Sequence, residues 1–440
     1  MPATPAPVST VTVDATPGDR TVMPHPGRLI ALDVLRGIAI LGTFLTNIWI
    51  FSSAAAGRSL NPLDRTDAEP EISDSLISQI SSVFDTSINL VTDGKFIGLL
   101  TIMFGIGLEI QRQSALRRGE RWPGRYPWRA GLLILDGLLN YIFIFEFDVL
   151  MGYGLTGLVV AAIMATSPRA QKIWMGIGIT AHLALMALTT PFILERLVPI
   201  DRGGDATTSL SDQIAEADQA TGGLTITDGT YWGGVVDRLT NFVGGRAEIP
   251  IMFLMGLGLF LVGAHLYRAG LFEERGRRLR IRVMALSFGI GLPIDWTLRL
   301  FFVDEAGAIP RYVTSSLVSF GVLALVAHFY VGRKRSGAVG TALSYVGRMA
   351  LTCYILQNLL ASIVFLPWGL NVAAHIEGEW STVWTLLIYV SLSAVLIGLS
   401  MLWLRRFPRG PIELVWHWSY TWICDRLDAR AERRRARRLA

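Results

Sequence analysis

The sequence has 440 residues, of which 51% are hydrophobic and only 17% are charged, and its formal net charge is +5 at pH 7. An ordinary soluble domain has about 25% charged residues, so this composition predicts a membrane protein and excludes a large soluble domain. The basic residues lie between apolar stretches, where they set orientation in a bilayer. The positive charge therefore does not indicate a nucleic-acid-binding protein.

The chain divides into three predicted parts. Residues 1–28 are rich in Pro, Thr and Ala and predict a disordered N-terminal tail. Residues 29–404 predict a transmembrane helical bundle, and 405–440 a basic segment that lies against anionic lipid on the cytoplasmic face. No cleavable signal peptide is expected, because the first apolar run is long enough to span and no small-residue cleavage site follows it.

The predicted fold is all-α, a polytopic bundle of about ten transmembrane helices, each near the 20 residues that a bilayer requires. The spans are expected at 29–51, 95–112, 129–147, 148–167, 173–195, 249–268, 283–301, 313–332, 341–366 and 383–404. The segment 74–93 is amphipathic and predicts a helix that lies in the membrane interface.

Loop charge predicts the orientation. The loops at 113–128, 169–172, 275–282 and 333–335 are basic, whereas those at 52–94, 196–248 and 367–382 are acidic or mixed. An even number of spans with both termini in the cytoplasm is the arrangement that follows the positive-inside rule throughout. The loop 196–248 is long for an unstructured connection, so it is either a functional lid or simply mobile.

The first span carries a polar stripe. Asp33 and Arg36 are three residues apart and share a helix face, and Thr43 and Asn47 continue that face. The stripe climbs roughly 20 Å, most of the hydrocarbon thickness, so it is expected to face protein or a cavity. It is either a local Asp33–Arg36 pair near the cytoplasmic surface or a polar track that links the two sides.

The second span begins at Lys95, and its glycines share one face with Thr101, a small-residue pattern that lets helices pack closely. Lys95 either reaches the lipid headgroups or pairs with Glu146 or Asp148 across the outer mouth. We favour the pair.

The stretch from Arg129 to Leu158 predicts two membrane helices joined by a very short turn at Phe145–Asp148. A turn this short cannot be a solvated loop, so Glu146 and Asp148 are expected at the rim of the bilayer. They either line a functional pocket or cap the following helix, whose N-terminal end favours anions.

The ninth span places Ser344, Arg348 and Thr352 at four-residue spacing on one face. An arginine inside the membrane needs a partner, and an anionic ligand group is one candidate for Arg348. On the seventh span, Asp295 and Arg299 are four residues apart and are expected to pair.

No metal site is predicted. The two cysteines, Cys353 and Cys424, fit no metal or disulfide pattern. His182, His265 and His328 are isolated in separate spans without metal-ligand spacing.

The sequence resembles the DUF418 or YeiB-like family of bacterial integral membrane proteins. The matching pieces are LDVLRGIAILGTFLTN, GKFIGLLTIMFGIG, FDVLMGYGLTG, MGLGLFLVGAHLYR, GRMALTCYILQ and RRFPRGPIELVW. This family is similar to the transmembrane acyltransferases, which include the acyltransferase-3 proteins and the lysosomal heparan glucosaminide acetyltransferase. The resemblance implies ten to eleven helices in the bacterial cytoplasmic (inner) membrane.

The resemblance also implies that acyl-CoA enters from the cytoplasm and that a sugar acceptor waits outside. The positions that match the family pattern are Arg36, Asn47, Lys95, Asp148, Arg348 and Gln357. On this interpretation Arg36 and Arg348, beside Asp33, hold phosphates of the donor, and Lys95 and Gln357 bind the acceptor.

The catalytic roles are expected in the turn and its surroundings. Asp148, or Glu146 in its place, takes the acceptor's proton, and Asn47 or Asn140 donates a hydrogen bond to the developing oxyanion. The family usually has a histidine eight residues before the turn aspartate, where this chain has Asn140. A neutral amide cannot be a general base, so a carboxylate takes that role, Asn140 only orients a substrate, or the chain does not do the chemistry.

The sequence thus favours a membrane acyltransferase that moves an acyl group, foremost acetyl, from acyl-CoA to an envelope glycan or glycolipid. The alternatives are a transporter or exporter of a small solute or lipid, and a non-catalytic membrane partner. The expected partners are membrane lipids and the glycan acceptor but no nucleic acid, and a homodimer is left open.

Overall fold

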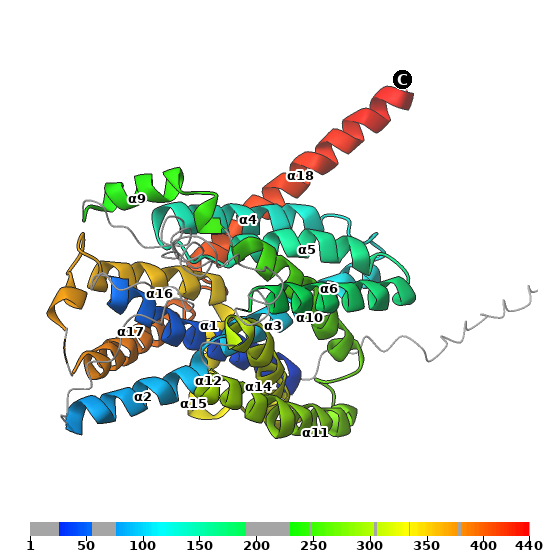
Figure 1. Cartoon of the computed structure of the whole chain (residues 1–440). Coiled ribbons are helices and arrows are strands. Elements are labelled where there is room, and N and C mark those ends of the chain that lie inside the picture. Colours follow the sequence, from blue (N-terminus) through cyan, green and yellow to red (C-terminus); the bar gives the residue numbers. More distant parts are fainter. Residues whose placement is uncertain are drawn as a thin grey trace, which may run out of the picture.

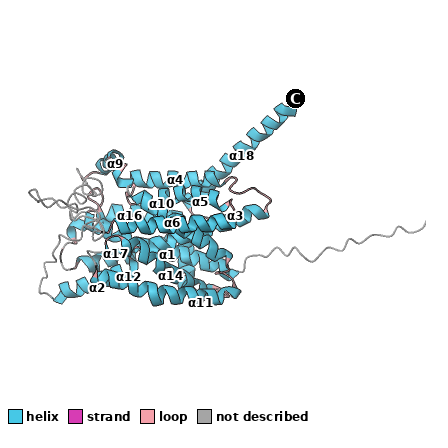
Figure 2. Ribbon diagram, turned by 45° about the vertical axis from the view of Figure 1, so that its right-hand side comes forward, coloured by secondary structure: helices cyan, strands magenta, loops and turns pink. Residues whose placement is uncertain are grey.

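The computed structural model describes residues 26–54, 76–190, 229–246, 248–302, 306–333, 335–376, 378 and 380–439. Predictions for residues 1–25, for 55–75 of the first long loop and for most of the loop 196–248 lie outside these residues. Every regular element within the described ranges is a helix (Figure 2). The predicted all-α fold is confirmed.

The α-helices are α1 (Pro26–Ala54), α2 (Leu76–Thr92), α3 (Lys95–Arg117), α4 (Tyr126–Phe143), α5 (Leu150–Met164), α6 (Pro168–Leu188), α9 (Tyr231–Thr240), α10 (Glu248–Arg268), α11 (Arg277–Leu286), α12 (Leu292–Phe301), α14 (Ser315–Tyr330), α15 (Gly337–Arg348), α16 (Ala350–Phe365), α17 (Ser381–Trp403) and α18 (Pro411–Leu439). Short 3-10 turns are η1 (Gly244–Arg246), η2 (Glu274–Gly276) and η5 (Val372–His375), and short π-helical turns are η3 (Ser287–Gly291) and η4 (Pro310–Thr314).

The long helices lie side by side in one body (Figures 1 and 2). The closest helix pairs are α1 with α15, α3 with α10, α10 with α6 and α4 with α5. The last helix, α18, leaves the body, and its far end projects away from the other helices (Figure 1). The predicted basic C-terminal segment is therefore a helix over 411–439.

Six helical segments in the described ranges are long and apolar enough to cross a membrane, and a seventh is counted if α15 and α16 form one broken span. The six lie at Ile30–Ser52, Gln79–Arg117, Gly244–Arg268, Glu274–Phe301, Pro310–Tyr330 and Ser381–Trp403. At 15 residues, α5 is apolar but shorter than a typical span. A polytopic membrane protein is confirmed, whereas ten spans and two cytoplasmic termini stay predictions.

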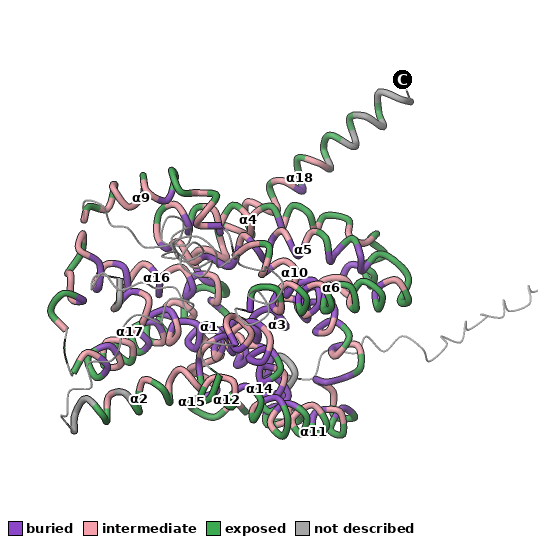
Figure 3. Tube along the Cα trace, viewed as in Figure 1, coloured by how far each residue is buried: buried purple, intermediate pink, exposed green. Residues whose placement is uncertain are grey.

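The most buried helices are α1 and α3, and they organise the core (Figure 3). Leu35, Phe44 and Ile48 of α1 are fully buried, whereas α17 and the α11–α12 segment expose most of their apolar surface and form the periphery. Thr43 and Asn47 are also buried. This part of the α1 stripe therefore faces protein, as predicted.

The predicted ninth span is broken. A bend of 88° separates α15 from α16, and Met349 at the break has the non-helical angles φ −113° and ψ 34°. The carboxylate of Glu413, from α18, accepts hydrogen bonds from the backbone N–H groups of Leu351 (2.9 Å) and Thr352 (3.2 Å). It thereby caps the start of α16, where the first N–H groups have no helical partner. The single stripe predicted for Ser344, Arg348 and Thr352 is therefore wrong.

Candidate functional site

The turn between α4 and α5 has the predicted form. The first helix ends at Phe143 and the second begins at Leu150, so only six residues connect them. The two helices approach closely because Gly137 has no side chain. A Cβ there would lie 2.6 Å from Asp148 Oδ1 and 2.3 Å from the backbone nitrogen of Met151.

Asp148 is buried in this turn and is held from two sides. Asn140 Nδ2, on α4, donates to Asp148 Oδ2 at 2.7 Å. The backbone N–H of Met151 donates to Oδ1 at 3.2 Å, so the carboxylate also caps the start of α5. Asn140 thus orients the aspartate, and the predicted capping role of Asp148 is confirmed.

Arg246, from η1, covers the turn but binds its backbone rather than its carboxylates. Its Nη1 donates to the carbonyl oxygen of Asp148 at 3.2 Å, and its Nη2 donates to the carbonyl oxygen of Glu146. The guanidinium lies 3.8 Å from the ring centroid of Tyr141. Sequence reasoning missed Arg246, whose signal was the run Gly-Gly-Arg immediately before an apolar helix.

The two turn acids differ in exposure: Asp148 is buried, whereas Glu146 is half-buried. A positioned carboxylate can accept a proton from a reacting group and return it, so both acids are candidates for that role.

Helix α16 packs polar side chains against this turn. The backbone N–H of Val149 donates to Tyr354 Oη at 3.4 Å, and Ser362 Oγ donates to the carbonyl oxygen of Ile144 at 3.4 Å. On the α1 side, Asn47 Nδ2 lies 3.5 Å from Asn358 Oδ1. The turn, α1 and α16 therefore meet in one region.

Several buried amides of this region lack partners. Gln357 is fully buried, and neither its nitrogen nor its oxygen has a hydrogen-bond partner in the described part of the chain. Asn358 Nδ2 and Asn140 Oδ1 are also unpaired. A buried unpaired polar group costs about 1–3 kcal/mol, so each one requires an explanation such as a bound molecule. We call Asn47, Asn140, Asp148, Gln357 and Asn358 the amide cluster.

The predicted donor-binding residues lie elsewhere. Arg36 Nη1 is 3.4 Å from Asp33 Oδ1, and these side chains are 39% and 26% exposed. Arg348, at the end of α15, is exposed and within electrostatic reach of Asp33. Arg36 and Asn47 are eleven residues apart on one helix, so roughly 16 Å separates Arg36 from Asn47 of the amide cluster. The local Asp33–Arg36 pair is confirmed, and no described hydrogen bond joins the two sets.

The predicted partner of Lys95 is wrong. Lys95 Nζ lies 2.6 Å from Asp295 Oδ2, and both side chains are buried. Asp295 also pairs with Arg299 at 3.2 Å, as predicted, and accepts a hydrogen bond from Thr314 Oγ1 at 2.6 Å. Helices α3 and α12 both pack on α14. This arrangement brings Asp295 of α12 to Lys95 at the start of α3.

Asp93, between α2 and α3, extends the pairing. It lies 2.6 Å from Arg299 and 2.7 Å from Arg311. We call Asp93, Lys95, Asp295, Arg299 and Arg311 the ion cluster. Each of its charges has an opposite charge within hydrogen-bond distance, so it fixes α3, α12 and η4 together.

Metal-ligating residues do not gather in the described ranges: no group of three or more His, Cys, Asp or Glu side chains comes together there. Cys353 and Cys424 are free thiols. His182 Nε2 lies 3.2 Å from the carbonyl oxygen of Tyr312, a structural contact between helices.

The fold and these clusters define a polytopic helical membrane protein with a buried polar site beside the α4–α5 turn. Residues 266–423 match the family described as "Protein of unknown function (DUF418)". The chain is 27% identical over 412 residues to the uncharacterized protein YeiB of Escherichia coli (strain K12), which covers 88% of this chain and 95% of YeiB. It is 26% identical over 405 residues to the uncharacterized protein YxaH of Bacillus subtilis (strain 168), which covers 88% of this chain and 93% of YxaH.

These matches show that the chain is similar to the DUF418/YeiB-like proteins, with the family match itself covering its C-terminal part. The predicted family resemblance is confirmed. No solved structure matches the chain.

Proposed function

We propose that the protein is a membrane acyltransferase that moves an acyl group, foremost acetyl, from cytoplasmic acyl-CoA to an envelope glycan or glycolipid. The observation that carries the proposal is the amide cluster: Asn140 holds the buried Asp148 carboxylate, and α16, which packs on the same turn, carries Gln357 with no hydrogen-bond partner in the described chain. Such amides are suited to hydrogen-bond the hydroxyls of a sugar and the oxygen of an acyl group.

Asp148 is the proposed base. The acceptor's hydroxyl or amine gives its proton to the Asp148 carboxylate while the acceptor's oxygen or nitrogen attacks the acyl carbon. The carbon–sulfur bond then breaks, and the leaving CoA thiolate takes up a proton. Asn140 holds the carboxylate at 2.7 Å and does not itself accept a proton. Gln357 or Asn47 donates to the oxygen that becomes negative during the attack.

The donor enters from the other end of α1. Arg36 and Arg348 are accessible there, and guanidinium groups bind phosphates through paired hydrogen bonds. The roughly 16 Å along α1 between Arg36 and Asn47 is a length that the extended arm of CoA bridges, with its thioester reaching inward. The charge pattern and the bacterial relatives support a bacterial cytoplasmic membrane with both termini inside.

The test uses the full chain in lipid nanodiscs with labelled acetyl-CoA and envelope extract. Transfer is expected for the natural protein and is expected to fall at least 100-fold in Asp148→Asn, whereas Glu120→Gln, an exposed acid on the loop after α3, retains the natural rate. The rate is expected to rise with pH as Asp148 loses its proton, and this dependence is expected to disappear in Asp148→Asn. Absence of both CoA binding and label transfer would refute the proposal.

Transport is the second candidate, and the broken α15–α16 helix favours it. Discontinuous helices with an end inside the protein are a feature of transporter binding sites. Flux of a labelled solute across proteoliposomes without acyl-CoA, abolished by Gln357→Leu, would support a carrier. A non-catalytic role predicts neither flux nor transfer, and a gain of transfer in Asn140→His would argue against it.

A further inference from the structure

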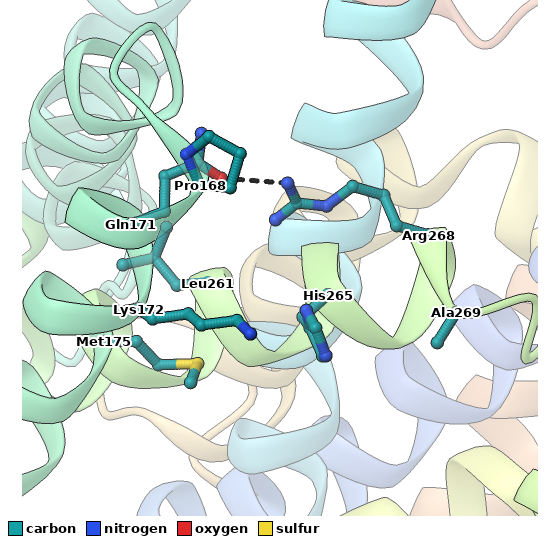
Figure 4. Close-up of a pocket in the computed structure, with 8 residues that line it drawn as sticks. All are labelled: Pro168, Gln171, Lys172, Met175, Leu261, His265, Arg268 and Ala269. Carbon is teal, nitrogen blue, oxygen red and sulfur yellow. Dashed lines mark hydrogen bonds between the residues drawn. The ribbon is translucent and has the colours of Figure 1, made fainter.

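A cavity of about 290 Å³ lies between the start of α6 and the end of α10 (Figure 4). Its lining residues are Pro168, Gln171, Lys172, Met175, Leu261, His265, Arg268 and Ala269. It shares no residue with the amide cluster or with the Asp33–Arg36 pair, so the acyltransferase proposal does not use it.

The cavity has a preset cation. Arg268 Nη1 donates to Gln171 Oε1 at 2.9 Å, and Gln171 is itself fixed because its Nε2 donates to the carbonyl oxygens of Met164 and Thr166. The fully buried carboxylate of Glu109 lies 3.9 Å from Arg268 Nε and anchors the guanidinium from behind. Arg268 is therefore held in place before any ligand arrives.

Two further basic side chains complete the rim. Lys172 and His265 point into the same space as Arg268 (Figure 4). Both are exposed, and neither makes a hydrogen bond or an ion pair with the described residues. The rim thus has three basic groups, of which only Arg268 is already engaged by a carboxylate.

The rest of the cavity is apolar. Met175 and Leu261 form part of its wall, and on the same side of α6 Ile179 and Leu183 are 37% and 45% exposed. A cationic rim above an apolar wall matches the two ends of a phospholipid, a charged headgroup and an acyl chain.

We propose that this cavity binds the phosphate of an anionic phospholipid, with Lys172, His265 and Arg268 around the phosphate and the acyl chain along Met175 and the exposed face of α6. Basic pockets between membrane helices are suited to anionic headgroups. A zwitterionic headgroup would bring its own cation toward these three groups, so selectivity for an anionic lipid is expected. The basic stretches 169–172, at the start of α6, and 275–282, which follows α10, are on the predicted cytoplasmic side, so the cavity is expected in that leaflet.

The experiment is native mass spectrometry of the purified full chain, titrated with phosphatidylglycerol or with phosphatidylcholine of the same acyl chains. The natural protein is expected to bind phosphatidylglycerol at least tenfold more tightly. The double variant Lys172→Gln/His265→Gln is expected to lose about tenfold of that affinity. Arg169→Gln, which removes a charge from the same helix outside the cavity, is the matched control and is expected to change the affinity less than twofold.

A second arm distinguishes a lipid from a soluble phosphoester. Glycerol 3-phosphate is titrated against the same three proteins, and thermal unfolding confirms that the variants remain folded. Binding of phosphatidylglycerol that glycerol 3-phosphate does not displace supports the lipid. Saturable glycerol 3-phosphate binding that depends on Lys172 and His265, without lipid selectivity, retains the phosphate site but overturns the lipid. If the double variant and Arg169→Gln bind every probe like the natural protein, the site itself is overturned.

Discussion

The ion cluster and the amide cluster are both buried, yet they are opposite in how their polar groups are satisfied. In the ion cluster, Lys95, Asp295 and Arg299 each have a charged partner at 2.6–3.2 Å. In the amide cluster, Gln357 has no partner at either end of its amide in the described chain. The charged side chains are thus in the region where each charge already has a partner of opposite sign.

This difference teaches which intramembrane polar groups indicate a site. A charge in an apolar helix is conspicuous in a sequence, but it is costly and is therefore the group most often neutralised by another part of the protein. A neutral amide is less costly to leave open. The unpaired amides of the amide cluster are consequently better markers of a binding site than Lys95.

The largest effect is expected where a paired charge loses its partner. Asp295→Ala leaves the buried Lys95 amine uncompensated and should lower the free energy of unfolding by about 3–5 kcal/mol. The measurement is an SDS titration of the purified protein. The same substitution at the partly exposed Asp33 should cost about 1 kcal/mol or less. Equal losses in the two variants would remove the distinction between the clusters.

An intermediate effect is expected at Glu413. This half-buried carboxylate, like those of the ion cluster, has hydrogen-bond partners for its oxygens. Glu413→Ala removes the acceptor for two backbone N–H groups and for Thr352 Oγ1, and should destabilise the protein by about 1.5–3 kcal/mol. Glu413→Gln keeps one acceptor oxygen and should recover part of the loss. A neutral result for Glu413→Ala in the same titration would contradict the capping role.

The smallest stability effect is expected at Gln357. Gln357→Leu replaces an unpaired amide with an apolar group of similar size and should change the free energy of unfolding by less than about 1 kcal/mol, while abolishing transfer. The control is Gln113→Leu, which removes an amide that donates to Glu109 Oε1 at 3.0 Å and should cost about 1–3 kcal/mol. A stable Gln357→Leu protein with full transfer activity would show that this amide serves no ligand.

The sequence was sufficient for features set by nearby residues. The short turn after Phe143 and the Asp33–Arg36 and Asp295–Arg299 pairs follow from helix spacing within a few residues. It was insufficient for contacts between distant helices: Lys95 and Asp295 are 200 residues apart, and their pairing depends on how the bundle closes.

The same limit applies to the candidate site. Asn140 and Asp148 are eight residues apart across one turn, so their proximity could be anticipated. Asn47 and Asn358 are 311 residues apart, and nothing in either segment specifies the other. Two adjacent amides in an apolar helix, Gln357 and Asn358, were the sequence signal for a site on α16. The family pattern indicated Gln357 alone.

The cap on α16 has a consequence for how the protein is made. Thr352 receives its partner from Glu413, which is synthesised 61 residues later. During translation the start of α16 therefore waits, with its N–H groups open, until the first turn of α18, the last helix, has left the ribosome. Chains that terminate before Glu413 would enter the membrane with this interior helix end unprotected, which offers the cell a simple chemical difference between finished and truncated copies.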